Sequence, residues 1–165
     1  MTRLPVLAAL LFSALSPLDA QVTVYLVRHA EKAQDGDSKD PDLSATGRAR
    51  AETLAQVVKD VGVTAIFATE LKRTQQTAAP LAKLTGVPLT IVPPKNTAAL
   101  VAKLRQAVGC ALVVGHSNTL PEIIRALGVN EPVTIADEEY DTIFVVKTEM
   151  RPPEFMRLRY ADKAE

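Results

Sequence analysis

The feature that most constrains this chain is a regular alternation of short apolar runs with longer stretches of helical periodicity. The apolar runs cover residues 22–27, 65–68, 89–92 and 110–114. Short apolar runs bounded by turn residues are typical of buried strands, and apolar residues three and four apart are typical of helices. Strands that alternate with helices predict an α/β fold, here a three-layer α/β/α sandwich with a mostly parallel sheet.

The helical stretches carry start and stop signals. Ser44 is a predicted N-cap of a helix that ends at Gly62, and Asn96 or Thr97 is the predicted cap of the third helix. Pro80 lies inside the second helix and predicts a kink or a break there. The remaining predicted elements are helices at 74–84, at 97–108 (stopped by Gly109) and at 121–127, and a C-terminal antiparallel hairpin of strands 142–147 and 155–160.

Residues 1–20 have the pattern of an export signal. Arg3 precedes an apolar run from Val6 to Leu15, and the segment ends at Ala20, a residue that suits signal peptidase. A membrane anchor is the alternative, but the run is shorter than the roughly 20 residues of a membrane-spanning helix. We therefore expect an exported protein, periplasmic or secreted. Residues 21–165 would form its one domain, without stable membrane association after cleavage.

The charge balance limits the classes of partner. The chain has 19 basic and 19 acidic residues and no net charge, so no positive field favours nucleic acid, and we expect no nucleic-acid partner. Any site for an anion must therefore be local. The single cysteine, Cys110, cannot form an intramolecular disulfide, so the hydrophobic core alone must hold the chain together.

The chain has only two histidines, and each directly follows a predicted buried strand. His29 ends the segment YLVRH, and His116 ends LVVGH. One histidine at a strand end is ordinarily a hydrogen-bonded bystander, but two such placements favour a functional role. Arg28 precedes His29, and Arg73 follows the second strand; alone, Arg73 reads as a solvated helix residue. If these strands are parallel neighbours, the four side chains meet at one edge of the sheet.

These residue types suit a phosphate group. Guanidinium groups match phosphate oxygens and stay charged at any working pH. A neutral imidazole is a competent nucleophile that can carry a covalent intermediate. Phosphoryl transfer mainly needs positioning and charge stabilisation, which this group supplies without a metal. The predicted substrate is therefore small and phosphorylated, a phosphate ester or a phosphoramidate.

Four segments resemble the histidine phosphatase superfamily, which has the phosphoglycerate-mutase-like fold. They are LVRHAEK, LSATGRARAETLA, FATELKRTQQTA and VVGHSNTLPEII, and they occur in the family's order. The resemblance implies that His29 is the phosphorylated nucleophile and that Arg28, Arg73 and His116 form the phosphate pocket. It also implies a phosphoric monoester hydrolase that needs no metal or other cofactor.

Two departures from the family pattern concern the site. Ala30 stands where the family usually has glycine, and we expect a negative φ there with an intact pocket. Residues 82–109 contain no aspartate or glutamate, although larger family members carry their proton-donating glutamate in this region. The chain therefore resembles the small form that lacks the acid-donor insertion, and its general acid is unassigned.

Several polar residues have two open interpretations. Glu31 is either the acid or a hydrogen-bonding orienter of Arg28 or of the loop. Asn118 is either a helix cap or a phosphate ligand, and Lys32 is either part of the anion pocket or exposed. Acidic residues on two loops either reach the site or are simply solvated, namely Asp35, Asp37 and Asp137 to Glu139.

The sequence thus predicts an exported, metal-independent phosphatase that works through a phosphohistidine on His29. One alternative is a non-catalytic binder of phosphorylated ligands, consistent with the unassigned acid. The other is a metal-dependent hydrolase with His29, His116 and Glu31 as ligands. Arg28 would oppose a cation there, and no paired-histidine ligand spacing is present.

Overall fold

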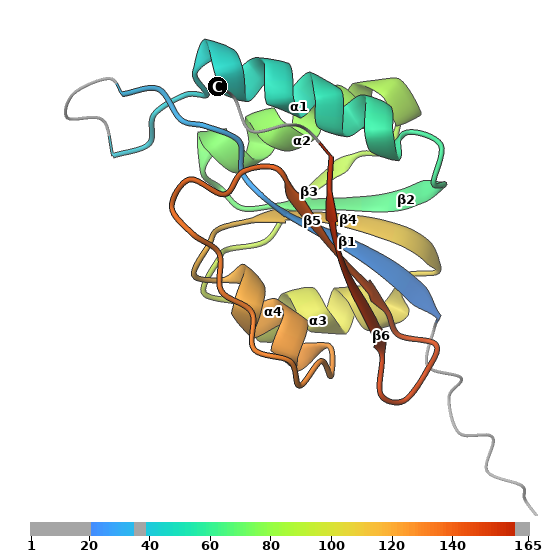
Figure 1. Cartoon of the computed structure of the whole chain (residues 1–165). Coiled ribbons are helices and arrows are strands. Elements are labelled where there is room, and N and C mark those ends of the chain that lie inside the picture. The colour runs from blue at the N-terminus through green and yellow to red at the C-terminus, as the bar shows by residue number, and fades with distance from the viewer. Residues whose placement is uncertain (1–20, 35–38, 161–165) are drawn as a thin grey trace, which may run out of the picture.

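A computed structural model of the chain describes residues 21–34 and 39–160. The predicted export signal at 1–20, and Asp35 and Asp37, lie outside these described residues. Figure 1 shows one central sheet, with helices α1 and α2 on one face and α3 and α4 on the other. Within the described residues, no helix is both long and apolar enough to cross a membrane.

The sheet has six strands in the order β3-β2-β4-β1-β5-β6. The four strands from β3 to β1 are parallel, whereas β5 is antiparallel to β1 and β6 is antiparallel to β5. This confirms the predicted fold class, a mostly parallel sandwich with a C-terminal hairpin. The strands are β1 Val22–Arg28, β2 Val63–Ala68, β3 Leu89–Ile91, β4 Gly109–Gly115, β5 Thr142–Lys147 and β6 Glu154–Arg159.

The helices begin and end close to their predicted signals. Ser44 is confirmed as the first N-cap, because its Oγ accepts a hydrogen bond from the Gly47 amide at 3.0 Å. Asn96 caps α3 in the same way, through the Ala99 amide at 3.1 Å. The helices are α1 Ala45–Val58, α2 Lys72–Thr85, α3 Thr97–Gln106 and α4 Leu120–Ala126.

The predicted bounds of three helices were wrong in detail. Helix α2 continues through Pro80 without a break, and a kink there stays a prediction. The helix begins at Lys72, whose amide donates to the Asp40 carboxylate at 3.0 Å. That acceptor comes from a distant loop and supports the start of the helix. Helix α1 ends at Val58 rather than at Gly62, and α3 ends before Gly109, which instead opens β4 with a φ of 90°.

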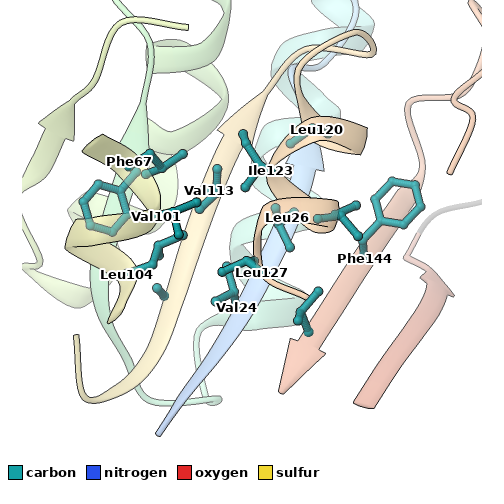
Figure 2. Close-up of a cluster of buried hydrophobic side chains, with 14 of the residues drawn as sticks. Val24, Leu26, Phe67, Val101, Leu104, Val113, Leu120, Ile123, Leu127 and Phe144 are labelled. Atoms are coloured by element: carbon teal, nitrogen blue, oxygen red, sulfur yellow. The ribbon is translucent and has the colours of Figure 1, made fainter. Parts of the chain in front are cut away.

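The core lies on both faces of the sheet. In β1, Val24 and Leu26 face α3 and α4, while Val27 packs on the opposite face with α1 and α2. Figure 2 shows the first of these clusters, in which side chains from β1, β2, β4 and β5 meet Val101 of α3 and Ile123 of α4. Helices on both faces explain why the central strands are continuous apolar runs.

The register of β1 and β4 fixes the position of the polar residues that follow them. Arg28 is paired with Gly115, and the His29 amide donates to the Gly115 carbonyl at 2.9 Å. His29 and His116 therefore leave the sheet side by side at its carboxyl edge, where ligands bind in open α/β sheets. Strand β2 is the next neighbour of β4 and leads directly into the start of α2, which carries Arg73.

Candidate active site

The two histidines form the centre of the candidate site. Their ring centroids lie 5.4 Å apart, with an angle of 61° between the ring planes. Both residues are buried, with 6% of His29 and 7% of His116 exposed to solvent. A group placed between the rings is therefore largely shielded from water, which strengthens any electrostatic interaction there.

The hydrogen bonding of His29 fixes which nitrogen is free. Nδ1 lies 2.8 Å from the Ala30 carbonyl oxygen, which can only accept, so we assign the ring proton to Nδ1. The pKa of His29 is lowered from 6.5 to about 3, chiefly by burial. The charges of Arg73, His116 and Arg28 also lower it, and the hydrogen bond to the Ala30 carbonyl acts in the opposite direction. The imidazole is therefore neutral at neutral pH, and Nε2 has a lone pair available for attack.

His116 is held from two sides. Its amide donates to Thr119 Oγ1 at 3.2 Å, and its Nε2 lies 3.2 Å from Thr69 Oγ1 at the end of β2. The pKa of His116 is lowered to about 4, chiefly by burial and also by Arg73 and Arg28, whereas Glu70 acts in the opposite direction. A dianion beside His116 would favour its protonated form, which adds a donor to the site.

Arg28 and Arg73 each retain a buried donor. Among the described residues, the Nε atoms of these two arginines are the buried side-chain nitrogens that have no hydrogen-bond partner. Buried donors are almost always satisfied in folded proteins, so two unsatisfied guanidinium nitrogens are notable. Both arginines also lower the pKa of both histidines, which shows that their charges act on the same small volume.

The other nitrogens of Arg28 hold the loop before β5. Nη1 donates to the carbonyl oxygens of Ala136 at 2.9 Å and Asp137 at 2.7 Å. Nη2 donates to the Tyr140 hydroxyl at 3.3 Å, and the guanidinium carbon lies 4.1 Å from the centre of the Tyr140 ring. This loop, which holds the acidic residues Asp137 to Glu139 and is called the acidic loop below, therefore reaches the site through its backbone and Tyr140.

Arg73 is positioned by an acid that the sequence interpretation did not single out. Its Nη1 lies 3.8 Å from Asp40 Oδ1, and the same carboxylate accepts from the Lys72 amide at 3.0 Å. Only 18% of the Arg73 side chain is exposed, so the alternative of a solvated helix residue is wrong. Asp40 thus links the loop before α1 to the first turn of α2.

Glu31 orients the loop, but not through Arg28. The Arg50 Nε lies 2.8 and 2.9 Å from the two carboxylate oxygens of Glu31, and an Arg50 terminal nitrogen lies 2.6 Å from Oε1. Arg50 is 8% exposed, so this is a two-pronged ion pair under α1. With both oxygens engaged by Arg50, the carboxylate is occupied in positioning the His29 loop.

The backbone at Ala30 has the predicted conformation. No described residue other than glycine has a positive φ, so Ala30 has the expected negative value. Its amide donates to Thr77 Oγ1 at 2.9 Å, and Thr77 in turn donates to the Arg73 carbonyl at 2.7 Å. One buried threonine therefore connects the His29 loop to the turn of α2 that carries Arg73.

The remaining predicted residues lie nearer the surface. Asn118 is exposed, and the N-cap of α4 is Thr119, so the helix-cap interpretation of Asn118 was wrong. Its role as a phosphate ligand stays a prediction. Lys32 is exposed as well, and its backbone forms an isolated bridge with Leu43.

Comparison with known proteins identifies the segment that carries His29 and both arginines. Residues 24–94 match the family model of the histidine phosphatase superfamily (branch 1). The predicted resemblance to this family is thereby confirmed over this segment. Over 76 residues the chain is 40% identical to "Probable phosphoglycerate mutase GpmB" of Enterobacter sp. (strain 638), and 38% identical to the protein of that name from Photorhabdus laumondii. Each alignment covers 42% of this chain and 35% of the relative, so the chain spans about a third of the curated relatives it matches.

Solved structures share the fold over most of the chain. The protein histidine phosphatase SixA, complexed with tungstate, has a TM-score of 0.69 and 20% identity, covering 83% of this chain and 96% of SixA. The mycobacterial glucosyl-3-phosphoglycerate phosphatase Rv2419c, in complex with inorganic phosphate, has a TM-score of 0.66 and 15% identity. It covers 86% of this chain and 98% of that protein. The histidine phosphatase fold therefore extends beyond residue 94, where the match to the family model ends.

His116 lies beyond the segment that matches the histidine phosphatase model, and strand register brings it to the site. Three further site residues were missed in the sequence: Thr69, Asp40 and Tyr140. Thr69 lies in FATELKRT, one of the segments that carries the family resemblance, and this was a usable signal. Asp40 and Tyr140 lie in polar loops, and no local pattern there indicates which side chain reaches the site.

Proposed function

We propose that this chain is a metal-independent phosphatase that hydrolyses a phosphate monoester or phosphoramidate through a phosphohistidine on His29. The observation that carries the proposal is one arrangement of groups. A neutral imidazole with a free Nε2 lies beside a second imidazole, and two buried guanidinium nitrogens next to them lack partners. A phosphate group supplies the acceptor oxygens that these donors need and the phosphorus that the imidazole attacks.

The reaction follows from the assigned protonation states. Nε2 of His29 attacks phosphorus, the bond to the leaving group breaks, and the Nδ1 proton stays on Nδ1, hydrogen-bonded to the Ala30 carbonyl oxygen. Arg28, Arg73 and His116 stabilise the charge on the equatorial oxygens during transfer. Water then attacks the phosphohistidine, which releases inorganic phosphate and restores the neutral imidazole. Asn118 is the remaining candidate phosphate ligand.

Export remains part of the proposal. An export signal at 1–20 would place the phosphatase in the periplasm or outside the cell, where small phosphorylated compounds are its substrates. Expression of the full chain in a Gram-negative host tests this. In the periplasmic or extracellular fraction we expect a protein whose mass corresponds to a chain that begins at Gln21. An uncut chain in the membrane fraction would favour the alternative of an N-terminal membrane anchor.

A steady-state assay tests the proposed pocket. Hydrolysis of p-nitrophenyl phosphate should fall by about 10- to 100-fold in kcat/KM in Arg73→Ala, because hydrogen bonds to charged groups are worth about 1.5–3 kcal/mol. Arg125→Ala is the matched control, since Arg125 is exposed on α4. Full activity of Arg73→Ala would refute the pocket.

The same assay separates the two alternative functions. Activity that persists in EDTA is expected, and its loss with recovery on added divalent metal would favour a metal-dependent hydrolase. The two-pronged contact of Glu31 with Arg50 argues against Glu31 as a metal ligand. A non-catalytic binder would bind inorganic phosphate but hydrolyse none of a broad panel of phosphate esters.

A further inference from the structure

The general acid is missing from the proposed mechanism. An alkoxide is a poor leaving group, so cleavage of an unactivated alkyl phosphate needs a proton donor at the bridging oxygen. Glu31 is held by Arg50 through both carboxylate oxygens, and residues 82–109 contain no acidic side chain. The donor is therefore sought outside Glu31 and this region.

We propose that Tyr140 is this donor, an inference that rests on the proposed function. Its ring centroid lies 6.2 Å from that of His29, with an angle of 56° between the planes. The phenol ring is therefore a close neighbour of the nucleophile. Its side chain is half-buried, so part of it is accessible to a bound ligand.

The contact with Arg28 orients the hydroxyl group of Tyr140. Nη2 of Arg28 donates to the Tyr140 oxygen at 3.3 Å, so the hydroxyl accepts at this point and its own proton is directed elsewhere. A guanidinium at this position also stabilises the phenolate that forms when the proton leaves. Arg28 thus has two partners in the reaction, the phosphate through Nε and the donor through Nη2.

The backbone around Tyr140 is anchored on both sides. Its carbonyl accepts from the Tyr160 hydroxyl at 2.9 Å, and the Asp141 carbonyl accepts from the Tyr160 amide at 3.0 Å. On the other side, Arg28 Nη1 holds the carbonyls of Ala136 and Asp137. These contacts fix the phenol relative to His29 before substrate binds, as proton transfer requires.

The proton balance closes over the two steps. As the bond from phosphorus to Nε2 of His29 forms, the bond to the alkyl oxygen breaks, and that oxygen takes the Tyr140 proton. In the second step the phenolate takes a proton from the attacking water, whose oxygen bonds to phosphorus as the bond to Nε2 breaks. The products are the alcohol and inorganic phosphate, and the enzyme returns to its starting state.

Glu70 is the competing donor. It follows Thr69, whose hydroxyl contacts His116, and its charge raises the pKa of His116. Its side chain is exposed and lies beside the second histidine, whereas Tyr140 lies beside the nucleophile. The two candidates are therefore tested together.

The test compares two substrates in Tyr140→Phe, which keeps the ring and removes the hydroxyl. For ethyl phosphate we expect kcat/KM to fall by about 10²- to 10⁴-fold, the usual contribution of a general acid. For p-nitrophenyl phosphate, whose leaving group needs no proton, we expect a change of less than about 5-fold. Tyr25→Phe in β1 is the matched control, because it also removes a half-buried phenol oxygen.

Three outcomes would overturn the inference. Equal losses on both substrates would mean that Tyr140 only positions Arg28, and no loss on either would exclude any role. A leaving-group-dependent loss in Glu70→Gln, absent from Tyr140→Phe, would assign the donor to Glu70. If Tyr140→Phe does not fold, the wild type decides: kcat/KM that falls steeply with leaving-group pKa across a series of phosphates excludes a donor. Wild type without turnover of either substrate would instead refute the proposed function itself.

Discussion

At the scale of single residues, His29 shows how burial prepares a nucleophile. His29 is 6% exposed, and the guanidiniums of Arg73 and Arg28 oppose a positive charge on its ring. An imidazole that stays neutral well below neutral pH keeps its Nε2 lone pair under ordinary conditions. The same two arginines that repel a proton attract a phosphate dianion, so one arrangement serves both binding and attack.

This arrangement predicts a pH dependence of stability. The pKa of His29 is about 3 in the folded chain against an ordinary value of 6.5, so between these values the unfolded chain binds a proton that the folded chain does not. The stability linked to this pKa shift is therefore fully present above pH 6.5, and the free energy of unfolding falls as the pH drops from there towards 3. In urea unfolding at pH 7 and pH 4.5, we expect His29→Asn to lose less stability than wild type. Equal losses in both proteins would contradict the assignment of a buried neutral imidazole.

At the scale of elements, the start of α1 is built around the loop that follows His29. A side-chain carbon at Gly47 would lie 2.1 Å from the Glu31 carbonyl oxygen, which also accepts from the Ser44 amide at 2.9 Å. The helix can approach the loop so closely only because residue 47 has no side chain. This contact, together with the ion pair between Arg50 and Glu31, fixes the loop that carries His29 relative to α1.

Gly47→Ala is therefore predicted to destabilise the protein, although replacing glycine by alanine in a helix ordinarily stabilises it. Alanine within a helix is usually more stable than glycine by about 0.5–1 kcal/mol, but here the new methyl group meets backbone. We expect a loss of about 1–3 kcal/mol in the free energy of unfolding, the usual cost of overpacking, with reduced phosphatase activity. Ala49→Gly, at an exposed position of the same helix, is the control and should cost about 1 kcal/mol with activity retained. A stabilised Gly47→Ala protein would show that the loop can move away freely.

The strands and helices could largely be predicted, because the signals that define them lie close together in the sequence. Apolar runs identified the strands, and the side chains of Ser44 and Asn96 cap helices by contacts within three residues of sequence. The error at the start of α2 occurred where a distant residue acts. Helix α2 begins at Lys72 because Asp40, far away in sequence, accepts its amide hydrogen bond.

At the scale of the whole molecule, the sheet assembles the site. The order of strands places β1 beside β4 and β4 beside β2, so that His29, His116 and Thr69 emerge next to one another. The candidate residues at strand ends could be predicted, because parallel strands deliver their ends to one edge. Tyr140 could not, because its place beside His29 depends on how the acidic loop wraps around Arg28.

The phosphohistidine on His29 is the central claim, and rapid chemical quench tests it most directly. Full-length protein is mixed with a ³²P-labelled phosphate ester, quenched within milliseconds, and the bound label is measured after acid and after base. We expect base-stable, acid-labile label that reaches one phosphate per chain at most, persists in Arg125→Ala and is absent from His29→Ala. Label that forms equally in His29→Ala, or turnover of the substrate without any trapped label on wild type, would contradict the account.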